Sequence, residues 1–326
     1  FEISFANEKG IGLGPTHEFF TLFSHELCHV ERQLFRTEQY ERGTLAVDKN
    51  GMFFSPLATP KAASILGKFL AKSIQMECLV DINFNPAIFK LCQGKEPVTV
   101  YDVDPELARQ LENPEKLANI GLTFLYPGLD SPGRELPLIP GGEDKEITQE
   151  NCQEFADLIK DFTCGKRMEP IVKSFVDGFN SVFPFSYLSV FTPEELNKVI
   201  AGDEPQITRE ELEKNVEITH GYTSESKQIG MLFDIISEMS KEDQRLFIQF
   251  ITGYAQLPIG GLASLHPKLS IAKKEDPNGQ MNPDEPLPSC MTCMNYFNLP
   301  PYTSKEKMKM KIMKAIHEGT TLFDLT

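Results

Sequence analysis

The sequence predicts an α+β protein of two lobes, a mainly helical one over residues 1–202 and a mixed α/β one over residues 207–326. In the first lobe, apolar residues recur at the three-to-four-residue spacing of amphipathic helices. The second lobe adds short apolar runs of strand-like composition, at residues 269–271 and directly after Cys293, to further helical segments. A polar link at 203–206 contains a proline and follows a glycine, which indicates a break between the lobes.

The composition is that of an ordinary globular protein, with 40% hydrophobic and 24% charged residues in a chain of 326. This length is enough for two or three domains with a sizeable core. No apolar run approaches the roughly 18 residues of a membrane-spanning helix, and no signal peptide is visible. Because the chain begins at Phe1 rather than Met, we expect it to be a fragment of a longer protein.

Acidic residues outnumber basic ones by 47 to 32, which gives a formal net charge of −15. This excess argues against nucleic-acid binding through a basic face. The seven cysteines are odd in number and scattered, as in a reduced intracellular chain. We therefore expect a cytoplasmic or nuclear protein with no nucleic-acid partner and no membrane contact.

Helical periodicity and capping residues define the elements of the first lobe. Residues 81–170 are broken by prolines and glycines, so only short elements are expected there. The expected elements are helices at 16–35, 61–78, 155–162 and 171–185, a strand at 121–125, and a helix that begins at Thr192-Pro193 with Glu195 in its first turn.

The second lobe contains three further N-cap signals, at Thr208, Ser240 and Ser304. Apolar residues at helical spacing follow the last two caps, and the last helix is expected to end with Gly319 at its C′ position. An acidic loop from Glu275 to Glu285 leads to the most informative stretch of the chain.

That stretch is a Thr-Cys dipeptide, Thr292-Cys293, between a proline-bounded loop and an apolar run. Pro286 and Pro288 fix the backbone φ angle and remove backbone donors, so we expect a stiff, exposed loop. Cys293 would then lie where a loop meets a strand, held rigidly and yet accessible. A nucleophile needs both properties.

The pair Cys290-x-x-Cys293 has two alternative interpretations, half of a zinc site or a redox motif. A zinc site needs further ligands, but no cysteine follows and the only later histidine is His317. A redox motif of this type opens a helix, whereas a proline-rich loop precedes this pair. We interpret the spacing as chance, Cys290 as a small packing residue and Cys293 as the reactive thiol.

The segment Leu-Pro-x-x-x-Thr-Cys at 287–293, followed by Leu-Pro-Pro-Tyr-Thr-Ser at 299–304, resembles the active site of HECT-type ubiquitin ligases. The version here is most similar to the ubiquitin-fusion-degradation subgroup. Gly-x-Gly-x-Gly-Pro-x-x-Glu-Phe at 10–19, Thr252-Gly253 and Phe323, four places from the end, extend the resemblance. One departure is Met291, because many members of the family have a histidine at this position.

The resemblance implies a bilobal HECT fold with residues Gly202, Asp203, Glu204 and Pro205 at the hinge. It also implies a small subdomain at about 95–170 whose apolar groove docks a ubiquitin-conjugating enzyme. By position, Leu107 and Leu111 on one side and Phe155 and Ile159 on the other match groove residues. The alternative is that all four simply pack the subdomain, since apolar pairs four residues apart fit either role.

The resemblance further implies two acyl transfers, in which Cys293 accepts ubiquitin as a thioester and a substrate lysine then attacks it. A free cysteine is a few per cent thiolate at neutral pH, so this chemistry needs no cofactor or metal. Asp324 is a candidate base for the lysine, Phe323 a candidate anchor for the tail, and Asn295 a candidate oxyanion donor unless it faces solvent. The alternative function is a non-catalytic HECT-like module that binds ubiquitin or a conjugating enzyme.

Overall fold

The computed structural model describes residues 3, 13–127, 135–274 and 282–321. The chain divides into two compact units, and their main boundary falls between Ile200 and Ala201. One unit comprises residues 23–78 and 82–200; the other comprises residues from 201 onward, together with 79–81 and the N-terminal residues up to 22. Within the described residues, no helix is long and apolar enough to cross a lipid bilayer.

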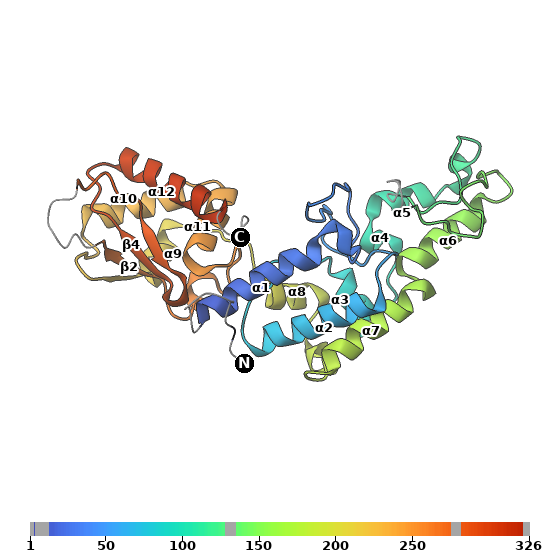
Figure 1. The fold of residues 1–326 in the computed structure, drawn as a ribbon, viewed down its shortest axis with the longest axis horizontal. Coiled ribbons are helices and arrows are strands. Elements are labelled where there is room, and N and C mark those ends of the chain that lie inside the picture. The colour runs from blue at the N-terminus through green and yellow to red at the C-terminus, as the bar shows by residue number, and fades with distance from the viewer. Residues whose placement is uncertain (1–2, 4–12, 128–134, 275–281, 322–326) are drawn as a thin grey trace. The chain divides into compact units, whose positions relative to one another are not determined.

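The first unit is helical, and its core is the packing of α2 on α7 (Figure 1). Gly67 of α2 and Gly178 of α7 let the two backbones approach closely, since a Cβ on either glycine would lie 2.1 Å from a carbonyl oxygen of the other helix. The elements up to the unit boundary are α1 (Leu13–Cys28), η1 (Val30–Arg32), α2 (Pro60–Gln75), α3 (Ala87–Gln93), α4 (Val100–Val103), α5 (Pro105–Leu111), η2 (Pro114–Leu117), α6 (Cys152–Cys164), η3 (Lys166–Met168), α7 (Glu169–Asn180), η4 (Phe185–Val190) and α8 (Pro193–Ala201).

The predicted cap of α8 is confirmed. Thr192 Oγ1 accepts a hydrogen bond from the Glu195 N–H, and Glu195 Oε2 accepts one from the Thr192 N–H. The helix predicted from Thr16 to Phe35 ends earlier, at Cys28. The Cys28 carbonyl accepts a hydrogen bond from the Ala46 N–H at 2.7 Å, so the chain leaves the helix to pair with residues 44–46.

The strand predicted at 121–125 is wrong. The structure has only isolated bridges there, from Thr123 to Glu146 and from Leu125 to Pro137. The backbone partners of this run are divided between residues 136–138 and residues 142–147, so neither pairing extends into a ladder. Instead of forming a strand, this run contributes Phe124 to the core of the subdomain, where its side chain is fully buried.

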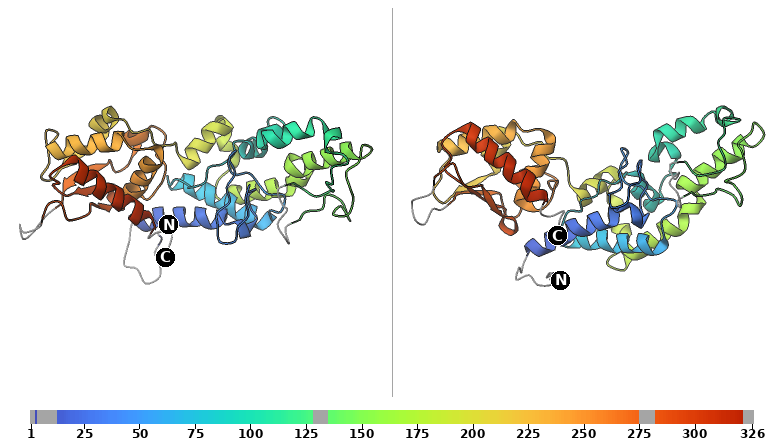
Figure 2. Two further views of the ribbon diagram at one scale, coloured as in Figure 1. Left: turned by 90° about the horizontal axis from the view of Figure 1, so that it is seen from above. Right: turned by 45° about the horizontal axis from the view of Figure 1, so that its top comes forward.

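The second unit is built on a sheet (Figure 2). Among the described residues this sheet has four strands in the order β1-β2-β4-β3. The pairs β1–β2 and β2–β4 are parallel, and β3–β4 is an antiparallel hairpin. The elements are α9 (Arg209–Asn215), β1 (Glu217–Thr219), α10 (Lys227–Ser237), α11 (Lys241–Thr252), η5 (Gly261–Ser264), β2 (Ser270–Lys273), β3 (Ser289–Met291), η6 (Thr292–Met294), β4 (Tyr296–Leu299) and α12 (Lys305–Thr321).

Helices α10, α11 and α12 pack with the sheet in one apolar cluster. Phe297 and Leu299 of β4 enter this cluster fully buried, whereas the alternate residues Tyr296 and Asn298 lie half-buried on the other face. The central strand of the unit is therefore fixed on one face by a continuous core.

The predicted N-caps of this unit are confirmed, because Thr208, Ser240 and Ser304 each accept a hydrogen bond from the N–H three residues on. The predicted end of the last helix is wrong. Helix α12 continues through Gly319 to Thr321, since a glycine costs a helix only about 1 kcal/mol and does not by itself stop it. Phe323, Asp324 and the glycines at 10 and 12 lie outside the described residues.

Candidate active site

Cys293 lies at the tip of the β3–β4 hairpin, in the single turn of 3-10 helix that joins the strands. The ladder pairs Met291 with Tyr296 directly below the turn, and β4 also pairs with β2 along its length. The Cys293 side chain is exposed. The hairpin thus presents a thiol to solvent from a turn whose two flanking strands are held in the sheet.

The loop before the hairpin is less exposed than expected. Pro288 is buried and Pro286 is half-buried, and the Tyr302 hydroxyl donates to the Pro286 carbonyl at 2.6 Å. The prediction of an exposed loop is wrong because residues after β4 cover this segment.

Cys290 and Cys293 occupy different environments. The Cys290 thiol donates to the Ile251 carbonyl at 3.2 Å, and burial raises the pKa of Cys290 to about 12. Cys290 therefore stays protonated and is a poor nucleophile, as the packing role requires. Across the described ranges, no cluster of three or more His, Cys, Asp or Glu residues could hold a metal ion.

Asn295 closes the turn that carries the thiol. Its backbone is left-handed at φ 46°, a conformation that asparagine tolerates. Its side-chain Nδ2 donates to the Pro267 carbonyl at 2.6 Å, and its backbone N–H donates to the Thr292 carbonyl at 3.3 Å. The side chain is 5% exposed, so the solvent-facing alternative is wrong. One of its two amide hydrogens is committed to Pro267.

Two exposed methionines flank the thiol, Met291 at 48% and Met294 at 53%. On the outer face of the sheet, Tyr296 lies beside the imidazole ring of His220, with 6.4 Å between the ring centroids. No sequence signal brings these two rings together, because β1 and β4 are joined only through β2.

In the first unit, the four residues expected to line a groove are all buried in one apolar cluster of the 95–170 region. Leu107 is 8% exposed, Leu111 6%, Phe155 5% and Ile159 0%. Phe155 also packs edge-on against Phe124, with ring centroids 5.6 Å apart. This burial favours the packing alternative for the set.

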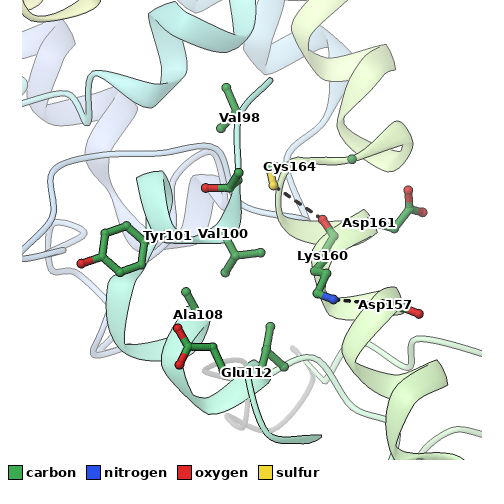
Figure 3. A pocket seen from close by; sticks show the side chains of 12 residues that line it. Val98, Val100, Tyr101, Ala108, Glu112, Asp157, Lys160, Asp161 and Cys164 are labelled. Atoms are coloured by element: carbon green, nitrogen blue, oxygen red, sulfur yellow. Dashed lines mark hydrogen bonds and ion pairs between the residues drawn. The ribbon is translucent and has the colours of Figure 1, made fainter. Parts of the chain in front are cut away.

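A pocket of about 650 Å³ opens beside this cluster, between α4 and α5 on one side and α6 on the other (Figure 3). Of the four predicted residues, Leu111 alone lines it. Its apolar lining includes Val98, Val100 and Ala108, and its polar lining includes Glu112, Asp157, Lys160 and Asp161. Lys160 is paired with Asp157 at 3.0 Å and Arg167 with Asp161 at 3.8 Å, so among the described residues Glu112 is the carboxylate of the lining without an ion pair.

The family model described as HECT-domain (ubiquitin-transferase) matches residues 21–326. The chain belongs to the HECT family. It is 32% identical over its whole length to ubiquitin fusion degradation protein 4 of Saccharomyces cerevisiae, and it covers 24% of that protein. It is also 32% identical over its whole length to the E3 ubiquitin-protein ligases UPL4 of Arabidopsis thaliana and TRIP12 of Danio rerio, covering 24% and 19% of them.

These matches confirm the HECT family and the ubiquitin-fusion-degradation subgroup, both of which the Cys293 segment predicts. The chain spans only 19–24% of the length of these relatives. The buried cluster and its neighbouring pocket fall in the 95–170 region, and the Cys293 hairpin falls in the unit that continues from residue 201 onward.

The segment that was predicted to form the HECT hinge is hydrogen-bonded to Leu257, in the unit that continues from residue 201 onward. The Asp203 N–H donates to the Leu257 carbonyl at 2.8 Å, and the Leu257 N–H donates to the Asp203 carbonyl at 3.1 Å. Gly202 has φ +83°, and a Cβ there would lie 2.6 Å from the Leu257 carbonyl oxygen. Pro205 is buried and Glu204 is exposed. These contacts leave little freedom at 202–203 itself.

Proposed function

We propose that the chain is the catalytic part of a HECT-type ubiquitin ligase that carries ubiquitin as a thioester on Cys293. One observation carries the proposal: in a chain of this family, an exposed thiol is held at the tip of an anchored hairpin. The expected partners are ubiquitin, a ubiquitin-conjugating enzyme and protein substrates that bear lysine. The cytoplasm or nucleus is the location that we propose from its cysteine usage.

In the first transfer, the Cys293 thiolate attacks the carbonyl carbon of the thioester between ubiquitin and the conjugating enzyme. The new carbon–sulfur bond forms, and the enzyme's cysteine leaves as a thiolate. Because one thioester replaces another, the step is nearly thermoneutral and depends mainly on positioning. A rigid hairpin supplies positioning, and Thr292 and Asn295 are proposed to shape its turn.

In the second transfer, a neutral lysine amine attacks the Cys293 thioester. An amide bond forms, the Cys293 thiolate leaves, and the amine loses a proton to a base. Met291 supplies no imidazole for this proton. We propose Asp324 as the base and Phe323 as the anchor of the tail; both remain predictions from the sequence, because they lie outside the described residues.

We place the docking site for the conjugating enzyme at the pocket between α4, α5 and α6. Its lining is largely apolar, and Tyr101 at its edge is 58% exposed, as a contact residue should be. Glu112 favours a partner loop that combines an apolar side chain with a basic neighbour. Of the four buried residues first assigned to the groove, Leu111 lines this pocket, and the other three would support it from behind.

The test is a loading assay with ubiquitin, activating enzyme and several conjugating enzymes, resolved on a gel without reductant. We expect an adduct that thiol reductant removes, that Cys293→Ala abolishes and that Cys290→Ala retains. A chain that binds ubiquitin or a conjugating enzyme but forms no adduct would support the non-catalytic alternative. Loss of the adduct in Cys290→Ala alone would refute the assignment of Cys293.

A further inference from the structure

The two chain segments at the base of the catalytic hairpin are joined by one carboxylate. Asp284 precedes β3, and Thr303 follows β4. Asp284 Oδ1 accepts from the Thr303 N–H at 2.8 Å, and Oδ2 accepts from the Thr303 hydroxyl at 2.7 Å. Lys307, in the first turn of α12, donates to the same Oδ2 at 2.6 Å. We call these three residues the base clamp.

Neighbouring contacts follow the same line between the two segments. Lys311 of α12 donates to the Glu285 carbonyl at 2.6 Å. The side chain of Tyr302 is fully buried, and its hydroxyl reaches the Pro286 carbonyl. The base clamp is thus the charged end of a row of contacts between the two segments, and this row continues toward the β3–β4 ladder.

The charge of Asp284 is well stabilised. Its side chain is 14% exposed, and the bonds from Lys307 and Thr303 lower the pKa of Asp284 to about 2. Because the pKa is lowered in the folded state, the clamp contributes fully above the unfolded pKa of about 4. Its contribution is lost as the pH falls through about 2. The carboxylate of the clamp is therefore charged at neutral pH.

We propose that Asp284 is a positioning residue for Cys293, an inference that rests on the proposed function. The ladder carries the turn about 10 Å beyond Ser289, at about 3.3 Å per residue. If the base opens and the edge strand β3 tilts by about 6° on β4, the thiol moves by about 1 Å over that length. An error of 1 Å in the placement of a reacting group lowers a rate by up to about 100-fold.

The clamp is separable from the fold of the unit. After its loss, the β3–β4 ladder, the parallel pairing of β4 with β2 and the burial of Phe297 all remain. We therefore expect clamp variants to stay folded and to lose the placement of the thiol, while the thiol itself stays exposed and reactive.

The test compares Asp284→Ala, Asp284→Asn and Thr303→Val with Glu225→Ala, a control at an exposed carboxylate before α10. Loading of Cys293 from a preloaded conjugating enzyme is measured in a single turnover, beside alkylation of Cys293 by iodoacetamide. We expect Asp284→Ala to slow loading at least tenfold and alkylation less than twofold. Asn, which still accepts from the Thr303 N–H, and Thr303→Val should be intermediate.

Wild-type loading by Asp284→Ala, or an equal fall in loading and alkylation, would overturn the inference. If the wild-type chain itself forms no adduct, the proposed function fails. Amide hydrogen exchange then tests separately whether the clamp holds the hairpin in place. Faster exchange confined to the amides of residues 289–299 in Asp284→Ala would support it, and unchanged exchange would refute it. If Asp284→Ala does not fold, Thr303→Val carries the same comparison.

Discussion

Helices α2 and α7 cross where Gly67 and Gly178 remove both side chains from the contact. An ideal Cβ on Gly67 would lie 2.1 Å from the Phe175 carbonyl oxygen, and one on Gly178 would lie 2.1 Å from that of Ser64. Both obstacles are helix backbone, which does not rotate away as a flexible side chain would. We predict that Gly67→Ala destabilises the first unit.

The magnitude follows from the geometry. Ordinary van der Waals contact begins at 3.4 Å, so the helices must separate by more than about 1 Å. A gap of about 0.5–1 Å already forfeits a quarter to a half of the dispersion energy of each contact across the interface. Overpacking typically costs about 1–3 kcal/mol, and this interface lies at the upper end. The better helix propensity of alanine returns about 1 kcal/mol. We expect a net loss of about 2 kcal/mol, or about 4–8 °C in the unfolding midpoint.

A calorimetric scan or urea titration measures this change. The matched control is Gly230→Ala in α10, where an added Cβ meets nothing within 4 Å. That variant should stabilise its own unit by about 0.5–1 kcal/mol through helix propensity. The reasoning fails if Gly67→Ala leaves the midpoint unchanged, or if both substitutions act with the same sign.

Three further predictions concern the site. Asn295→Gly keeps the left-handed backbone and loses only the hydrogen bond to Pro267, whereas Asn295→Ala also strains the turn by about 1 kcal/mol. The rate of single-turnover loading should therefore fall less in Asn295→Gly than in Asn295→Ala. Equal loading rates in the two variants would contradict this. Phe155→Ala should lower the unfolding midpoint, at a cost of about 3–5 kcal/mol in stability. Tyr101→Ala should leave the midpoint unchanged and raise the concentration of conjugating enzyme needed for loading. The reverse pattern would place the docking site on the buried cluster. Removal of residues 323–326 should spare loading of Cys293 and slow transfer to lysine, and equal transfer from preloaded full-length and truncated chains would refute a role for the tail.

The features that the sequence predicts well depend on residues close together in the chain. Each N-cap bond spans three residues, so Thr192, Thr208 and Ser240 are recognisable without knowledge of the fold. The Cys293 motif is local in the same way, and it sufficed to predict the family. Apolar runs also predicted the strand that follows the thiol.

The features that were missed depend on distant residues. Asn295 meets Pro267 across 28 positions, and Asp284 meets Thr303 across 19. Helical periodicity shows that Phe155 belongs to an apolar face but does not show whether that face covers a core or lines a groove. The strand predicted at 121–125 failed for a related reason, because its backbone partners are divided between two distant segments, at 136–138 and 142–147.

The order of the strands has a consequence for synthesis of the chain. Among the described residues, β4 is the last strand along the sequence, and yet it lies between β2 and β3. Until it has emerged from the ribosome, β2 has a bare edge of unpaired backbone groups, and the pairing of residue 270 with residue 296 must wait for all the chain between them. The hairpin that carries the exposed thiol is therefore also the one that completes the sheet. A nascent chain that stalls before Leu299 leaves the edge of β2 unpaired, and chaperones and proteases recognise such an edge.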